Sequence, residues 1–197
     1  MILVRYADDY IAGFEHQEDA ERFLADLRER LAKFALELTP EKTRLIEFGR
    51  YAAERRQARG LGKPETFDFL GFTHICAKTR AGGFWVRRIT ISKRIRAKLA
   101  EVKAEVRRRR HQPIPVQGRW LASVVRGHMA YYAVPGNTQA VAAFRDQVTR
   151  HWIKALRRRS QKGRALTWAQ MHWIEKRWLP PVRVMHPFPA ERLTVRT

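Results

Sequence analysis

The first fourteen residues, MILVRYADDYIAGF (residues 1–14), decide the fold expected for the start of the chain. Two short apolar runs, 2–5 and 10–14, flank a polar centre in which Asp8 and Asp9 are adjacent. This pattern is typical of a β-hairpin with Ala7, Asp8 and Asp9 at its tip. Aspartate is common in turns because its side chain bonds nearby backbone, so the pair alone fits either a structural turn or a metal site.

Charge is distributed unevenly along the chain. The 197 residues carry a net charge of +21, with 40 Lys and Arg against 19 Asp and Glu. Residues 1–75 hold 12 basic and 14 acidic residues, whereas residues 76–197 hold 28 basic and 5 acidic residues. So basic a segment suits a polyanionic partner, and phosphates dominate the binding of nucleic acid. We therefore expect the second segment to bind nucleic acid; a merely solvated, arginine-rich surface is the alternative.

The bulk composition predicts a globular protein in a reducing compartment. Hydrophobic residues make up 45% of the chain, with 6 Trp, 10 Phe and 5 Tyr, which is enough for a packed core. Cys76 is the single cysteine, so no disulfide can form within the chain. The sequence shows no apolar run as long as a membrane span and no signal-peptide pattern at its start. We expect a soluble cytoplasmic protein without a membrane partner.

The segment after the first hairpin continues the mixture of helix and strand. Apolar residues at helical spacing, preceded by acidic residues, predict a helix over 17–37. A strand is expected over 43–48 and a loop over 50–64. Aromatic and β-branched residues predict a second hairpin that pairs 67–77 with 84–91.

Beyond residue 91 the pattern is helical and basic. Helices are expected from Ser92 to the prolines at 113 and 115, over 116–132, over 139–159, and over a short segment ending before Pro180. The predicted N-caps are Ser92, Thr138 and Thr167. One apolar stripe of the third helix is expected in the core: Val141, Phe144, Val148, Trp152 and Leu156. Most of Tyr131, Tyr132, Trp168, Trp173 and Trp178 should also be packing residues, with stacking on unpaired bases as the alternative.

Six motifs, taken in order, resemble those of one protein family. Tyr6-Ala7-Asp8-Asp9 between apolar strands resembles the catalytic hairpin of reverse transcriptases. The others are LELTPEKTRLIEF (36–48), FDFLGFTH (67–74), LASVVRGHMAYYAVPGN (121–137), and LRRRSQKG (156–163) with HPFP (186–189). Together they resemble the reverse transcriptase/maturase proteins of group II introns.

The sequence pattern predicts an α+β fold in three parts, and the resemblance gives each part an identity. Residues 1–91 would be the end of a reverse transcriptase palm, with two β-hairpins and a helix. Residues 92–179 would be the basic helical thumb, or maturase-specific domain, and 180–197 an irregular tail.

The resemblance also implies roles for individual residues. Asp8 and Asp9 would be catalytic and would bind Mg²⁺, and Tyr6 would lie near the nucleotide or the primer. Lys42 falls where a proton donor for catalysis is found, although a solvated charge after a helix is the alternative. Phe69, Leu70 and Gly71 would position the primer end; hairpin core with a bulge glycine is the alternative. The residues expected to bind RNA are Arg94, Lys98, Arg107, Arg108, Arg126, Arg157, Arg158 and Arg159.

The family copies intron RNA into DNA, as an RNA-directed DNA polymerase, and assists splicing of its intron. Family members carry the fingers and a third metal-binding carboxylate before the Tyr-Ala-Asp-Asp hairpin, so this chain is expected not to extend a primer alone. Its partners would be intron RNA and an RNA/DNA template–primer. The alternatives are a non-catalytic RNA-binding splicing cofactor, or half of a polymerase assembled with a separate fingers–palm chain.

Overall fold

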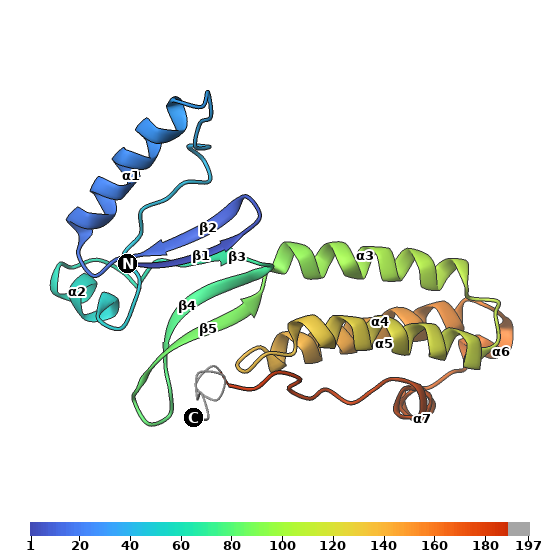
Figure 1. Cartoon of the computed structure of the whole chain (residues 1–197). Helices are drawn as coiled ribbons and strands as arrows, with labels where there is room; N and C mark the ends of the chain where they lie inside the picture. Colours follow the sequence, from blue (N-terminus) through green and yellow to red (C-terminus); the bar gives the residue numbers. More distant parts are fainter. Residues whose placement is uncertain (189–197) are drawn as a thin grey trace, which may run out of the picture. The chain divides into compact units, whose positions relative to one another are not determined.

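The computed structural model describes residues 1–188 as a mixed α+β protein, which confirms the predicted fold class. By packing, the chain divides into two compact units, Met1–Glu65 and Thr66–Thr197. Within the described residues there are a two-stranded sheet, a three-stranded sheet and seven helices (Figure 1). None of these helices is long and apolar enough to cross a membrane.

The first unit begins with the predicted hairpin. Strands β1 (Ile2–Tyr6) and β2 (Asp9–Gly13) pair antiparallel, with Ile2 opposite Gly13 and Tyr6 opposite Asp9. The turn between them therefore consists of Ala7 and Asp8 alone, and Asp9 is already the first residue of β2. Ala7 has a φ of 51°, which is uncommon for a residue with a side chain.

Helix α1 (Gln17–Ala32) ends five residues before the predicted end at residue 37. The backbone N–H of Leu36 donates to the carbonyl of Leu31, and that of Ala35 donates to Ala32. Ala35 has a φ of 53°. These two bonds around a left-handed residue are those of a Schellman motif, which closes a helix. Apolar periodicity alone does not reveal this ending, because an alanine takes the position that glycine usually occupies.

Two further predictions for the first unit are wrong. Residues 43–48 form no strand, and the expected loop over 50–64 contains helix α2 (Ala52–Ala58). A strand needs a neighbour to pair with, and the two-stranded sheet of this unit pairs only β1 with β2. The segment from Arg44 to Glu65 is instead held by side chains.

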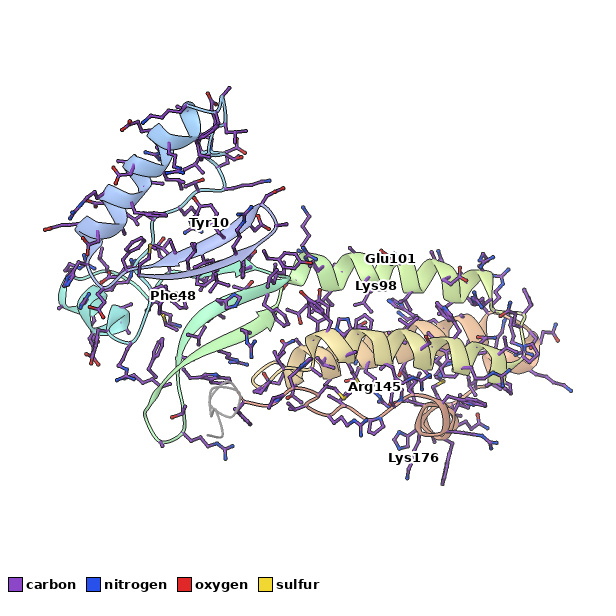
Figure 2. The ribbon with its side chains drawn as sticks, in the orientation of Figure 1. Tyr10, Phe48, Lys98, Glu101, Arg145 and Lys176 are labelled. Atoms are coloured by element: carbon purple, nitrogen blue, oxygen red, sulfur yellow. The ribbon has the colours of Figure 1, made fainter. Side chains whose placement is uncertain are left out.

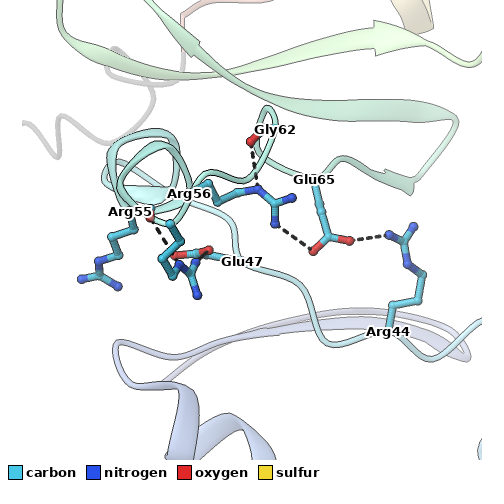
Figure 3. A network of polar contacts seen from close by, with 7 residues as sticks. Arg44, Glu47, Arg55, Arg56, Gly62 and Glu65 are labelled. Carbon is cyan, nitrogen blue, oxygen red and sulfur yellow. Dashed lines mark hydrogen bonds and ion pairs between the residues drawn. The ribbon is translucent and has the colours of Figure 1, made fainter.

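Figure 3 shows that network of arginines and glutamates. Glu65 accepts from Arg44 at 2.9 Å and lies 3.8 Å from Arg56, whose Nε donates to the carbonyl of Gly62 at 3.2 Å. A second pair joins Arg59 to Glu47. The network folds this polar segment back on itself without a hydrophobic core.

The first unit buries very little apolar surface. Ala52 is the only buried residue among 1–65, and α1 has none. Several large apolar side chains are instead exposed, with Ile2 73% and Phe34 67% accessible. Because burial of apolar surface is the main stabilising term in folding, this unit by itself has little to hold it together.

The second unit starts with three strands. Strands β4 (Phe72–Lys78) and β5 (Phe84–Thr90) form the predicted hairpin, and the additional β3 (Phe67–Phe69) pairs with β4. The turn between β3 and β4 consists of Leu70 and Gly71, both with positive φ, 49° and 81°. Because Leu70 is apolar and lies between Phe69 and Phe72, the sequence FDFLGF gives little sign of this turn.

Helices make up the rest of the second unit. They are α3 (Ser92–Arg108), α4 (Ile114–Tyr132), α5 (Thr138–Arg157), α6 (Gln161–Arg164) and α7 (Trp168–Trp178). The predicted stripe of α5 is buried at all five positions, and it packs with apolar residues of α3, α4 and α7. The hydrophobic core of the protein lies here.

The ends of these helices correct several predictions. Ser92 is the first residue of α3 and not its cap, which is Ile91; Asn137, not Thr138, precedes α5. Pro115 lies in the first turn of α4, where its missing N–H costs nothing, so α4 begins two residues before the prediction. The cap at Thr167 is confirmed, and with Gln170 it forms a capping box.

Strand β5 is fastened to the turn between α4 and α5. Buried Asn137 accepts from the N–H of Thr90 at 3.0 Å and donates to its hydroxyl at 2.7 Å and to the carbonyl of Tyr132 at 2.8 Å. Arg87 donates to the carbonyl of Gly136, and the ring of Trp85 lies where a side chain on Gly136 would be. The three strands therefore pack as part of the helical unit.

The boundaries expected at 91 and 179 come from the change of sequence pattern, whereas packing divides the chain after Glu65, and these boundaries stay predictions. Of the expected tail, residues 182–188 contain no helix or strand, and Met185 donates to the carbonyl of Ala133. Residues 189–197, including the last residue of the HPFP motif, lie outside the described residues.

Candidate functional site

The β1–β2 hairpin presents both predicted metal ligands to solvent. Asp8 lies in the turn and Asp9 starts β2, and both are exposed. Tyr6 lies opposite Asp9 in the ladder, so these two side chains share one face of the hairpin. Arg5 donates from Nε to the carbonyl of Ala7 at 2.9 Å and braces the turn. The hairpin thus brings together three of the predicted site residues.

The chemistry of this donor set suits a hard divalent cation. Within residues 1–188, the side chains of Asp8 and Asp9 have no hydrogen-bond or ion-pair partner in the protein, so four carboxylate oxygens are available. Magnesium takes oxygen ligands and is commonly held by one or two carboxylates together with water and substrate phosphate. In the same residues no cluster of three or more His, Cys, Asp or Glu side chains could hold a metal ion.

Lys42 lies in a turn after the end of α1. Its backbone N–H and that of Thr43 both donate to the carbonyl of Thr39, at 3.1 and 2.9 Å. The Lys42 side chain is exposed and has no ion-pair partner within the described residues. The structure does not place it in contact with Asp8 or Asp9, so its catalytic role stays a prediction.

The Leu70-Gly71 turn is locked by two tyrosines from α4. The hydroxyl of Tyr131 donates to the carbonyl of Leu70 at 2.8 Å. A Cβ on Gly71 would come within 3.2 Å of the Tyr132 hydroxyl, a tight contact, and the φ of 81° also favours glycine at this position. Buried Phe72 stacks on Tyr131, with ring centroids 5.8 Å apart, and meets the edge of Tyr132.

These contacts revise the sequence interpretation of the turn. Gly71 occupies a two-residue hairpin turn and not a bulge. The sequence predicts no role for Tyr131 and Tyr132 at this turn, because the hydrogen bond from Tyr131 to Leu70 spans 61 residues. The sequence signal for this contact is the adjacent Tyr-Tyr pair before the Pro-Gly-Asn turn. Asn137 of that turn donates to the carbonyl of Tyr132 and so holds the pair in position.

The eight predicted RNA-binding residues come from α3, α4 and the end of α5 with the residues that follow it. Arg94 and Lys98 lie near the start of α3, Arg126 lies in α4, and the other five lie near the ends of α3 and α5. Lys98 is paired with Glu101 at 2.8 Å on α3 (Figure 2). All except half-buried Arg157 and Arg159 are exposed.

Glu105 neutralises part of the charge at the end of α3. Arg108 donates to it twice, at 2.8 and 2.6 Å, and Arg109 also pairs with it. These hydrogen bonds, first from Arg108 and then from Arg109, lower the pKa of Glu105 to about 2. Arg109 also lies over the ring of Trp120, 5.0 Å from its centroid. Arg107 has no protein partner within the described residues and is the freer cation for a ligand.

The expectation that most of the five singled-out aromatics are packing residues is wrong for Trp173, which is 74% exposed, and for Trp168, which is 52% exposed. Tyr131 is half-exposed, yet its ring packs on Phe72 and Tyr132. Tyr132 and Trp178 are partly buried against the core, as predicted. Exposed tryptophans beside cations are a surface on which an unpaired base can stack.

His128 is a buried titratable group in the helical core. Its ring stacks on Phe144, with centroids 3.7 Å apart, and contacts Tyr132. Its Nε2 is buried without a hydrogen-bond partner among the described residues. Burial, helped by the nearby charge of Lys98, lowers the pKa of His128 to about 4. The ring is therefore neutral at physiological pH, and it acts as packing.

Comparison with known proteins gives a family match for the first part of the chain. No curated protein and no solved structure matches it. Residues 1–74 match the sequence model of the family described as "Reverse transcriptase (RNA-dependent DNA polymerase)". That stretch contains the Asp8–Asp9 hairpin and the Leu70-Gly71 turn, and it ends inside β4. The N-terminal 74 residues are thus a segment similar to the reverse transcriptase domain.

Proposed function

We propose that this chain is a C-terminal portion of a group II intron reverse transcriptase/maturase, acting in the cytoplasm on intron RNA and its template–primer. The observation that carries the proposal is the reverse transcriptase match over residues 1–74, with two adjacent, unpaired carboxylates on a hairpin turn. The maturase part rests on the motifs over 121–137 and 156–163, and on the charge of the segment that holds them.

In this proposal the hairpin is the metal-binding part of the polymerase site. Asp8 and Asp9 would hold Mg²⁺, which when bound would neutralise charge on the phosphates during nucleotide transfer. Tyr6, on the same face as Asp9, contacts the nucleotide or primer. In the complete polymerase, Lys42 would donate a proton at the leaving phosphate. The Leu70-Gly71 turn, with Phe69, positions the primer end, and the tyrosines of α4 hold that turn in shape.

Metal binding tests the first part of the proposal. Mn²⁺ is the probe, titrated into the full chain and followed by electron paramagnetic resonance of the free ion. The double variant Asp8→Asn/Asp9→Asn should lose the strongest site, because two neutral amides bind a hard cation far less well than two carboxylates. Glu15→Gln/Glu18→Gln removes the same charge from the same unit and should leave that site intact. Equal binding by both double variants would refute the assignment.

A second candidate function is an RNA-binding splicing cofactor without catalysis. The specific observation in its favour is the 28 basic and 5 acidic residues of the segment 76–197. Binding of a group II intron RNA should be compared with binding of an unrelated folded RNA of equal length, across a range of salt. Tighter binding of the intron RNA supports the proposed maturase function. Equal binding of both RNAs, with a steep loss at high salt, supports a general RNA-binding module.

A further inference from the structure

Two arginine runs far apart in the sequence meet at one end of the second unit. Helices α3 and α5 pack together and run in the same direction, so their C-terminal ends lie side by side (Figure 1). Buried Gln117 fixes the corner after α3: it donates to the carbonyls of Arg110 and Gln112 and accepts from Nε1 of Trp152 on α5. Cations from residues 107–110 and 157–164 are thereby gathered at this end.

A basic hollow opens where α5 passes into α6. It has a volume of about 470 Å³, and its lining is Arg157, Arg158, Arg159, Ser160, Gln161 and Arg164. Four of the six lining residues carry a positive charge, and none is acidic. Arg158 and Arg164 are exposed, and their side chains have no hydrogen-bond or ion-pair partner within residues 1–188. Their donors are free for an anion.

Arg157 joins this hollow to an exposed tryptophan. Its Nε donates to the carbonyl of Leu166 at 2.8 Å, which fixes the side chain, and its guanidinium lies 6.0 Å from the ring centroid of Trp168. Trp168 in turn lines a second hollow, of about 390 Å³, with Asp146, Thr149, Arg150 and Glu175. A basic hollow and an aromatic, mixed polar hollow are therefore neighbours.

Helix α7 is held firmly enough to keep Trp168 in place. Arg145 of α5 pairs with Glu175 of α7, and its Nε donates to the carbonyl of Pro180 at 2.9 Å. Arg145 is among the side chains labelled in Figure 2. The capping box at Thr167 fixes the first turn of α7, in which Trp168 lies.

We infer that the two hollows form a subsite for one unpaired nucleotide of a nucleic-acid strand. The arginine hollow takes its phosphate, since Arg158 and Arg164 present free guanidinium donors to an anion. Trp168 takes the base by stacking, and the polar groups of the second hollow face the base edge. The inference rests on the proposed function for the nucleic-acid partner, and it adds the residues and the single-stranded substrate.

The test is binding of a fluorescent single-stranded RNA of about 12 nucleotides to the full chain, followed by fluorescence anisotropy at several salt concentrations. Arg158→Gln/Arg164→Gln should weaken binding at least tenfold at low salt and reduce the slope of log K against log salt by about 1, because phosphate contacts are lost. Trp168→Ala should weaken binding at least fivefold and leave the slope unchanged, since stacking involves no counterion release. Trp168→Phe should retain most of the affinity.

A matched control removes the same amount of positive charge from the start of α3. Lys93→Gln/Arg96→Gln should change the affinity less than threefold. If the arginine variant behaves like this control, or Trp168→Ala binds like wild type, the subsite is refuted. Polyphosphate is the second probe: it should lose affinity in the arginine variant alone, and an equal loss in Trp168→Ala would overturn the stacking role.

The outcomes also separate this inference from the proposed function. If wild type binds no RNA or template–primer at all, both the subsite and the proposed function are refuted. If wild type binds RNA normally and both variants do as well, only the subsite fails. Circular dichroism and thermal melting of each variant show whether it is folded before binding is compared.

Discussion

At the scale of single residues, two buried amide side chains, Asn137 and Gln117, hold turns of the second unit in place by hydrogen bonds. The side chain of Asn137 accepts from the N–H of Thr90 and donates to the Thr90 hydroxyl and to the carbonyl of Tyr132. Gln117 serves two carbonyls and the indole of Trp152. A buried donor or acceptor that loses its partner costs more than the bond itself contributes, so such residues tolerate little change.

Asn137→Ala should destabilise the protein by about 3 kcal/mol, since three hydrogen bonds are lost and the buried N–H of Thr90 is left unpaired. Urea denaturation measures this change as a lower midpoint. Gln139→Ala, an exposed position two residues away, is the matched control and should change stability by less than about 0.5 kcal/mol. A small effect of Asn137→Ala, no larger than that of the control, would contradict the assigned role.

His128 should make the second unit sensitive to mild acid. Its pKa is about 4 in the folded state, below the ordinary value of 6.5, so between these pH values the unfolded chain binds a proton that the folded chain does not. Stability from this group is complete above pH 6.5 and is lost as the pH falls toward 4, by an amount on the order of 3 kcal/mol.

The measurement is unfolding free energy as a function of pH in wild type and His128→Phe. The phenylalanine keeps an aromatic ring against Phe144 and removes the titration, so its profile should be flatter between pH 6.5 and 4.5. Glu105, with a pKa of about 2, does not lose its contribution until the pH falls below its ordinary value of 4.5. Parallel profiles for the two proteins would show that His128 does not carry the dependence.

At the scale of elements, helix ends decide where side chains of the candidate site are placed. Helix α7 begins at Trp168 because the Thr167 hydroxyl accepts from the N–H of Gln170 while the Gln170 side chain accepts from the N–H of Thr167. Helix α1 ends early because Ala35 adopts a left-handed conformation.

Removing the cap of α7 gives a prediction at this scale. Thr167→Ala should cost about 1 kcal/mol in unfolding free energy, and Thr167→Ser, which keeps the hydroxyl, much less. Chemical denaturation monitored by circular dichroism measures both. Equal stability of the two variants would mean that packing of Met171 and Ile174, and not the capping box, holds the first turn.

The elements that could be predicted from the sequence are those whose residue pattern is local to the element itself. The buried stripe of α5, from Val141 to Leu156, repeats at helical spacing and was predicted correctly. The first hairpin was also predicted, because alternating apolar runs and a polar centre are local signals. The strand expected over 43–48 failed, since β-propensity does not supply the neighbouring strand that a ladder needs.

Parts of the candidate site could not be predicted because they depend on long-range packing. Tyr131 reaches Leu70 across 61 residues of sequence, and the arginines at 107–110 and 157–164 meet only once α3 and α5 are packed. Asp8, Asp9 and Tyr6 were predictable as a group, since one tight turn brings them together.

At the scale of the whole molecule, the two units differ greatly in how much they bury. The second unit contains all of the buried core except Ala52 within the described residues. Local stability follows burial and contact density, so the two units should open with very different free energies.

Hydrogen exchange of the full chain, followed by mass spectrometry, tests this difference. Amides of α1, which has no buried residue, should exchange at least a hundredfold faster than amides at the centre of α5, which has eight. Helix α4, with seven buried residues, serves as the internal reference and should resemble α5. Protection of α1 within tenfold of that of α5 would contradict the difference.

The fastening of β5 by Asn137 has a practical consequence for anyone dividing this chain for separate expression. A fragment that began at residue 92 would discard Thr90 and leave the amide of Asn137 with only the Tyr132 carbonyl to bond. It would also remove Trp85 from above Gly136 and uncover that corner of the core. A fragment that begins at Thr66 retains each of these contacts, so it is the better starting point for crystallisation or nuclear magnetic resonance.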